Sequence, residues 1–193
     1  MFEFLGYTSG VLFMLSVIPY VRSILKGNTK PQRMTWLIWT ILVFIALFSQ
    51  LAEGATWSLL LTAGDAMTII IVFLFSIKYG VGGFRKIDIL SLIGAGVSLI
   101  IWYLTKEAAF ALFLIIIIDL IGANLTIIKT WKNPETENWV GWAMCGAGGL
   151  FGVFAVGSFN IVLLSYPLYI FIINSVVAII ILIRKKRCLA NSI

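Results

Sequence analysis

The sequence predicts an all-α, polytopic membrane protein in which seven transmembrane helices form two parallel three-helix repeats joined by a linker helix. Three observations lead to this prediction. Of the 193 residues, 61% are hydrophobic and only 11% are charged, whereas soluble domains average about 25% charged residues. The basic residues gather at alternate connections between apolar segments. A short aromatic pattern also occurs twice, at corresponding places in the chain.

Seven apolar segments follow one another along the chain, and each is long enough to cross a bilayer as a helix of about 20 residues. We expect them at 5–25, 35–52, 57–77, 87–105, 108–129, 139–158 and 160–183. The N-terminus lacks the basic start and the small-residue cleavage site of a secretory signal. The first segment is therefore expected to remain in the mature protein as a true span.

The distribution of positive charge supports this helix count and predicts an orientation. The 14 lysines and arginines lie at the first, third and fifth connections and after the seventh segment, except for Lys106. By the positive-inside rule, the N-terminus then faces outward and the C-terminus is cytoplasmic. We expect an integral protein of a bacterial plasma membrane. Topology and anionic lipid headgroups explain the net charge of +6, so a nucleic-acid partner is not expected.

The repeated pattern consists of a proline followed by tryptophans five and eight residues later. It reads PQRMTWLIW at 31–39 and PETENWVGW at 134–142. Aligning the two copies places segments one to three over segments five to seven. Three crossings reverse the direction of the chain, so two parallel repeats need one more crossing between them, which the fourth segment supplies. The expected division is a first repeat, a linker helix, a second repeat and a cytoplasmic tail, at 1–80, 81–106, 107–187 and 188–193.

Two carboxylates are the only ionisable residues deep within the predicted spans: Asp65 and Asp119. A charged carboxylate at mid-bilayer costs at least about 2.5–3.5 kcal/mol, so such residues usually face a cavity, find a partner or stay protonated. Both are candidates for proton coupling, and Asp65 is also a candidate for solute binding. Asn174 is the best match to Asp65 in the second repeat, where acid and amide would bracket a polar solute. The alternative for all three is a hydrogen bond that holds neighbouring helices together.

Four tryptophans lie at the cytoplasmic ends of the second and sixth segments. A membrane-interface role is expected for Trp36 and Trp139. Trp39 and Trp142 lie one turn deeper, where an inward orientation would let them stack on a flat solute or close the cytoplasmic side. Pro19 interrupts the first segment and removes a backbone hydrogen bond. It is expected to be a hinge, with a static bend as the alternative.

Other kinds of chemistry are not expected. The chain has no histidine, which excludes His-based metal sites and imidazole proton relays. It shows no metal-ligand cluster, phosphate-binding loop or nucleophile motif, so no metal, cofactor or enzymatic activity is expected. Its two cysteines, Cys145 and Cys188, provide no disulfide framework. The glycines of CGAGGLFG at 145–152 are expected to let helix backbones approach closely.

In these features the chain resembles the SWEET, SemiSWEET and PQ-loop superfamily of seven-helix membrane transporters. The local likeness is clearest in SVIPYVRSILKGNTKP at 16–31, where Pro19 and Tyr20 occupy the position of the family's intramembrane Pro-Gln pair. The resemblance implies alternating access of a small solute between two triple-helix bundles. In that family an Asn in each third helix contacts the sugar at the cavity centre, and these positions map onto Asp65 and Asn174.

The resemblance leaves the solute and the coupling open. Lysosomal PQ-loop transporters of amino acids use membrane carboxylates for proton coupling, which fits Asp65. Bacterial nicotinamide riboside transporters combine the same helix arrangement with Trp-rich pockets, so a vitamin-like solute is also an alternative to a sugar. Facilitated diffusion without protons is a further alternative. So is a receptor or assembly protein, because the KDEL receptors share this fold without transporting. Self-association is left open.

Overall fold

The computed structural model describes residues 1–190, except for the side chains of Leu125 and of 187–190. The side chain of Cys188 and residues 191–193 of the predicted tail therefore lie outside the described part. Within it the chain is all-α, as predicted, with a single isolated β-bridge between Gln32 and Val81. The elements are α1 (Phe2–Leu25), α2 (Arg33–Ala52), α3 (Leu59–Tyr79), α4 (Lys86–Thr105), α5 (Ala108–Lys132), the 3-10 helix η1 (Pro134–Thr136), α6 (Trp139–Ala155) and α7 (Ile161–Ala190).

The helices begin and end where local chemistry favours it. Glycines with positive φ follow the ends of three helices: Gly27 after α1, Gly54 after α2 and Gly157 after α6. Glycine adopts this conformation without the steric cost that a side chain brings, which makes it a common helix terminator. At the start of α6, the Asn138 side chain accepts a hydrogen bond from the backbone N–H of Gly141 at 3.0 Å. The seven helices thus match the seven apolar segments to within a few residues, apart from the longer C-terminal end of α7.

Length and surface chemistry fit an integral membrane protein. Six helices, α1 to α5 and α7, are long and apolar enough to span a bilayer, and α6 is a shorter apolar helix of 17 residues. Seventeen residues extend about 25 Å, close to the lower limit for spanning. Large apolar side chains such as Leu74, Ile100 and Phe154 are more than half exposed on the outer faces. Such surfaces are unfavourable in water and favourable in lipid.

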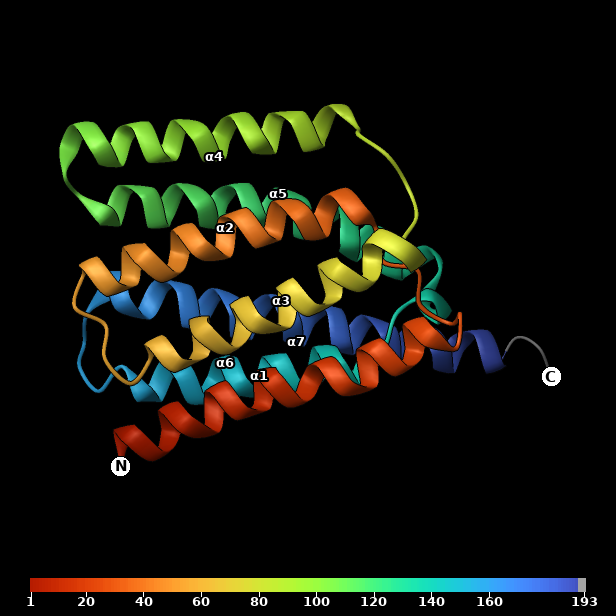
Figure 1. Ribbon diagram of the computed structural model, residues 1–193. Coiled ribbons are helices and arrows are strands. Elements are labelled where there is room, and N and C mark those ends of the chain that lie inside the picture. Colours follow the sequence, from red (N-terminus) through yellow and green to blue (C-terminus); the bar gives the residue numbers. More distant parts are fainter. Residues whose placement is uncertain (191–193) are drawn as a thin grey trace.

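Consecutive helices run in opposite directions, so the two termini lie at opposite ends of the bundle (Figure 1). The end that carries the C-terminus also carries the connections 26–32, 80–85 and 133–138, and is here called the basic end. The other end, called the opposite end, carries the connections 53–58, 106–107 and 156–160. Among the described residues, every lysine and arginine except Lys106 lies at or near the basic end.

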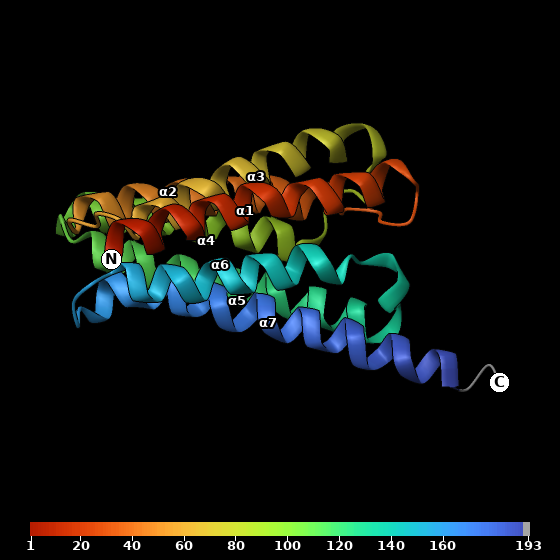
Figure 2. The same cartoon turned by 90° about the horizontal axis from the view of Figure 1, so that it is seen from below.

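The helices form a closed ring of six with one helix outside. Helix α3 packs between α1 and α2, and α7 packs between α5 and α6. The ring closes because α1 also contacts α6, while α2 also contacts α5. Helices α1 to α3 lie on one side and α5 to α7 on the other (Figure 2). Helix α4 packs outside the ring, against α5 and α2.

Close helix contacts and an apolar cluster seal the ring toward the opposite end. A Cβ on Gly64 of α3 would lie 2.7 Å from the carbonyl oxygen of Gly10 in α1, and one on Gly149 of α6 would lie 2.6 Å from the backbone nitrogen of Phe171 in α7. The glycines therefore permit the close packing expected of them. The interior between these contacts is filled by buried side chains that include Phe13, Leu42, Ile45, Leu61, Leu112 and Ile115.

Candidate functional site

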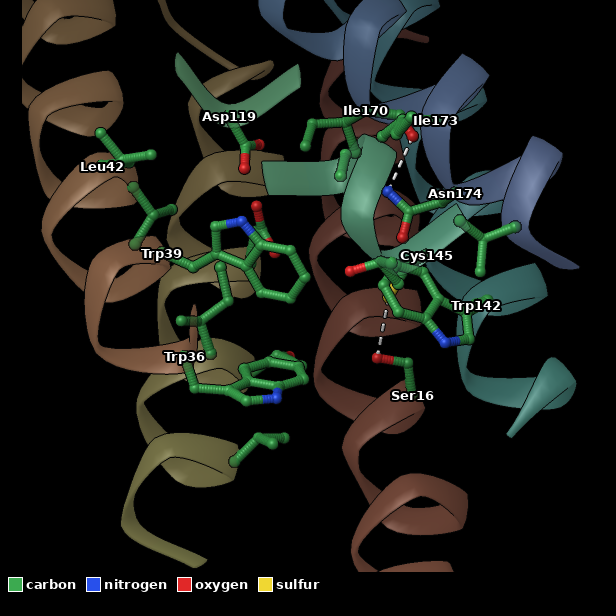
Figure 3. Close-up of a pocket in the computed structure, with 18 of the residues that line it drawn as sticks. Ser16, Trp36, Trp39, Leu42, Asp119, Trp142, Cys145, Ile170, Ile173 and Asn174 are labelled. Carbon is green, nitrogen blue, oxygen red and sulfur yellow. Dashed lines mark hydrogen bonds between the residues drawn. The ribbon is translucent and has the colours of Figure 1, made fainter. Parts of the chain in front are cut away.

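A central cavity of about 90 Å³ lies inside the ring (Figure 3). Every helix of the ring contributes to its lining, whereas α4 contributes no residue. The residues predicted for solute binding and proton coupling, which come from five different helices, all line this one cavity: Trp39, Asp65, Asp119, Trp142 and Asn174. The cavity therefore brings together side chains that are far apart in the sequence.

Asp65 lies on α3 and is held by a tyrosine of α7. The residue is 7% exposed, and its Oδ2 accepts a hydrogen bond from the Tyr166 hydroxyl at 3.1 Å. Its Oδ1 accepts no hydrogen bond from the described residues. Because α3 and α7 belong to different sides of the ring, this hydrogen bond crosses between the two sides.

Asp119 lies on α5 and has a second tyrosine of α7 as its partner. The Tyr169 hydroxyl donates to its Oδ2 at 2.8 Å. Its Oδ1 is buried and has no hydrogen-bond partner among the described residues. The indole nitrogen of Trp39 is turned toward this carboxylate (Figure 3). Tyr166 and Tyr169 are three residues apart, so one face of α7 holds both acids.

Asn174 lines the cavity but does not face Asp65. Its Nδ2 donates to the Ile170 carbonyl oxygen of its own helix at 2.8 Å, which leaves its Oδ1 directed into the cavity (Figure 3). It lies eight residues beyond Tyr166, the partner of Asp65, or about 12 Å along the helix axis. The facing pair expected from the repeat is therefore not observed. Matching Asn174 to Asp65 required the loop before α7 to be about six residues longer than the loop before α3. The connection before α7, 156–160, is no longer than the connection before α3, 53–58.

Four aromatic rings form a layer on the basic side of the cavity. Ring centroids are 5.4 Å apart for Tyr20 and Trp36, 5.1 Å for Trp36 and Trp39, and 6.4 Å for Trp39 and Trp142. All four residues also line a wider basin of about 240 Å³ toward the basic end. The interface role expected for Trp36 is wrong, because that side chain is only 8% exposed. Trp139, at 40% exposed, lies where an interface role was expected.

The basin contains a buried carboxylate that the sequence analysis did not select. Glu137 is 5% exposed, and its Oε2 accepts hydrogen bonds from the Tyr20 hydroxyl and the Trp142 indole, both at 3.1 Å. Its Oε1 pairs with the Lys129 ammonium at 2.8 Å. Glu137 thus connects α1 with α5 and α6 and holds two rings of the aromatic layer.

Pro19 lies within α1, which continues past it without interruption. Its carbonyl oxygen accepts a hydrogen bond from the Asn138 side chain at 3.3 Å, so the residue is in contact with the start of α6. Pro19 does not line the cavity, and its role as a hinge stays a prediction. Cys145 does line the cavity, where its thiol donates to the Ser16 hydroxyl at 3.2 Å.

Comparison with known proteins finds no relative of this chain. No family model, no curated protein and no solved structure matches it. Among the described residues, no group of three or more Cys, Asp or Glu side chains is placed to hold a metal ion.

Proposed function

We propose that this protein is a membrane transporter that moves a small polar solute by alternating access between two three-helix bundles. The observation that supports this most is the central cavity, whose lining includes acid, amide and aromatic side chains and to which all six helices of the ring contribute. Carboxylates within membrane spans are costly and usually mark a substrate or ion pathway. The cavity is where such a pathway would cross the mid-plane.

The helix contacts support a division into two related bundles. Exchanging α1 with α5, α2 with α6 and α3 with α7 converts each contact of the ring into another observed contact. The α1–α3 contact becomes α5–α7, the α2–α3 contact becomes α6–α7, and the α1–α6 contact becomes α5–α2. A pseudo-two-fold axis between parallel repeats produces this pattern. Helix α4, outside the ring, has the place of a linker between repeats at 1–80 and 107–187.

In this proposal the basic end faces the cytoplasm, in keeping with the positive-inside rule. The aromatic layer of Tyr20, Trp36, Trp39 and Trp142 is then the cytoplasmic gate, and the apolar cluster around Leu61 closes the outward path. Alternating access requires the cytoplasmic gate to open while the apolar cluster stays closed, and the reverse. The two bundles would have to rock about the α1–α6 and α2–α5 contacts to do this. Glu137 holds the gate closed, because it joins Tyr20 of one bundle to groups of the other.

Proton coupling is placed at Asp65 and Asp119. The Tyr166–Asp65 hydrogen bond joins the two bundles, whereas the Tyr169–Asp119 bond lies within the second bundle. A hydrogen bond to a charged carboxylate is roughly twice as strong as one between neutral groups. Protonation of Asp65 therefore weakens a contact between the bundles, which links proton binding to their relative movement.

The test begins with a thermal-shift screen of the purified protein against sugars, amino acids, nucleosides, organic amines and vitamins, because a ligand that binds only the folded state stabilises it. Uptake of the ligand found is then measured in proteoliposomes with and without a pH gradient. We expect the gradient to drive accumulation by the wild type but not by Asp65→Asn. Gradient-driven accumulation by Asp65→Asn would refute coupling at that residue. A ligand that binds and never enters the liposomes would favour the receptor alternative.

A further inference from the structure

We infer that the central cavity binds a small organic cation, and that the carried solute is therefore cationic. The cavity site stands on its own geometry, whereas its role in transport rests on the proposed function. Three properties of the cavity lining favour a cation: its acidic side chains, its free hydrogen-bond acceptors and its aromatic walls.

The cavity lining contains two acidic side chains and no basic one. Asp65 and Asp119 line the cavity, whereas no lysine or arginine does. Among the described residues, the ion pairs are Arg85 with Asp88 and Lys129 with Glu137, so the nearest cationic side chains at the basic end already have partners. Two carboxylates in a confined, largely apolar space favour a bound cation, because burial of an unpaired charge is costly.

Three oxygen atoms of the lining are free to accept hydrogen bonds from a ligand. Oδ1 of Asp119 is buried without a hydrogen-bond partner among the described residues. The hydrogen bond to Asp65 is made at its Oδ2, which leaves its Oδ1 free, and Oδ1 of Asn174 points into the cavity. The matching donors are already used, since both tyrosine hydroxyls donate to the two acids and the Asn174 amide donates to its own helix. A ligand rich in donors is complementary to this set.

Some of the other lining donors are occupied within the protein, whereas the Trp36 indole and the Thr126 hydroxyl donate to no described residue. The hydroxyls of Ser16 and Thr68 both donate to the carbonyl oxygen of Phe13, and the Trp142 indole donates to Glu137. A sugar has no positive charge to pair with the two acidic side chains, although the few free donors could serve some of its acceptors. The charge and the free acceptors together favour an ammonium, guanidinium or similar group over a neutral polyol.

The aromatic walls favour an organic cation over a metal ion. Trp36, Trp39 and Trp142 line the cavity together with tyrosines on two helices, and aromatic faces attract alkylammonium and guanidinium groups through cation–π interactions, most strongly on Trp. A metal ion needs a set of converging oxygen ligands, and the described residues contain no such group of three. The aromatic walls instead suit a cation that carries carbon atoms.

The test uses two pairs of compounds that match in shape and differ in charge: choline with 3,3-dimethylbutan-1-ol, and methylguanidinium with methylurea. Binding to the purified full-length protein is measured by isothermal titration calorimetry. We expect at least one cation to bind at least about tenfold more tightly than its neutral counterpart, which corresponds to about 1.4 kcal/mol. Neutral members that bind as well as the cations, or cations of both shapes that fail to bind, would overturn the inference.

Variants separate a cavity effect from general electrostatics. Asp119→Asn keeps the shape of the side chain and should weaken cation binding at least about tenfold with little effect on a neutral compound. Glu3→Gln removes the same charge from an exposed position on α1. It should change neither the affinity for the cation nor the affinity for the neutral compound. If Asp119→Asn does not fold, Trp39→Leu and Trp39→Phe provide a second test, because only the leucine variant removes the aromatic face. Equal cation affinity in both Trp39 variants would contradict the aromatic contribution.

Transport and cation binding can fail separately. Cations that bind without entering proteoliposomes would leave the site in place and refute its role in transport. Uptake of a neutral solute by a protein that binds no cation would refute the cation site and leave the transporter proposal intact.

Discussion

Replacing Glu137 with glutamine should open the aromatic layer at the basic end. The Glu137 carboxylate accepts hydrogen bonds from Tyr20 and Trp142 and pairs with Lys129, and only 5% of the residue is exposed. Glutamine keeps the shape and one acceptor oxygen but loses the charge. The Trp142 indole and the Lys129 ammonium can only donate, and they contact different oxygens of the Glu137 carboxylate. The amide NH₂ replaces one of these oxygens, so at least one of the two donors is left without an acceptor.

The size of the effect follows from these contacts. A hydrogen bond to a charged group contributes about 1.5–3 kcal/mol, and removal of one partner of a fully buried ion pair costs about 3–5 kcal/mol. The Lys129 side chain is 33% exposed, so water compensates part of the loss on that side. We therefore expect the closed arrangement to lose about 2–3 kcal/mol. This corresponds to a shift of roughly 30- to 150-fold in the ratio of closed to open molecules.

The assay is the rate at which N-ethylmaleimide modifies Cys145, which lines the cavity beyond the layer. Cys188→Ser makes Cys145 the only thiol, since the chain has two cysteines. The thiol should be modified at least about tenfold faster in Glu137→Gln than in the parent protein. This threshold lies below the shift of roughly 30- to 150-fold expected in the ratio of closed to open molecules. Glu135→Gln is the matched control, because Glu135 is exposed two residues away. An unchanged rate in folded Glu137→Gln would refute the role of Glu137 in closing the layer.

Three further outcomes are expected. Tyr169→Phe removes the hydroxyl that donates to Asp119, so it should lower the unfolding free energy by about 1–3 kcal/mol; an unchanged calorimetric Tm would contradict this. Gly149→Leu should cost about 1–3 kcal/mol, because its side chain meets the Phe171 backbone. Gly96→Leu, with open space at its Cβ position, should stay within about 0.5 kcal/mol in the same measurement. Green fluorescent protein fused after the C-terminus should fluoresce if that end is cytoplasmic, and fluorescence lost there but gained by an N-terminal fusion would reverse the orientation.

The helices were predictable because they are long, continuous apolar segments, which is what a lipid bilayer requires of a spanning chain. A span needs about 20 apolar residues with all backbone hydrogen bonds made internally, and this leaves a signal that does not depend on tertiary contacts. Glycine at the end of a helix adds a local signal, as at Gly27 and Gly54. The observed helices consequently agree with the apolar segments, including α6, whose 17 residues are few for a span.

Residue roles were harder to predict, because they depend on how each helix is rotated and how far it is shifted. Trp36 and Trp139 occupy equivalent places in the repeated pattern, yet one is buried beside the cavity and the other is exposed. Tyr166 and Tyr169 carried a usable signal, since two tyrosines one turn apart share a helix face, but nothing local identified the acids as their partners. Glu137 lay within the repeated pattern, and only its contacts with α1 and α5 distinguish it from the exposed Glu135.

The sequence alone determined the number of helices, their apolar character, which is compatible with a membrane protein, and the candidates Asp65, Asp119, Asn174, Trp39 and Trp142, because hydropathy and buried charge act residue by residue. Only the tertiary structure decided that these five side chains share one cavity, that tyrosines of α7 hold both acids, and that Asn174 lies at a different depth from Asp65. The physical reason is that cavities form between helices, and their lining depends on packing contacts among residues that are distant in the chain.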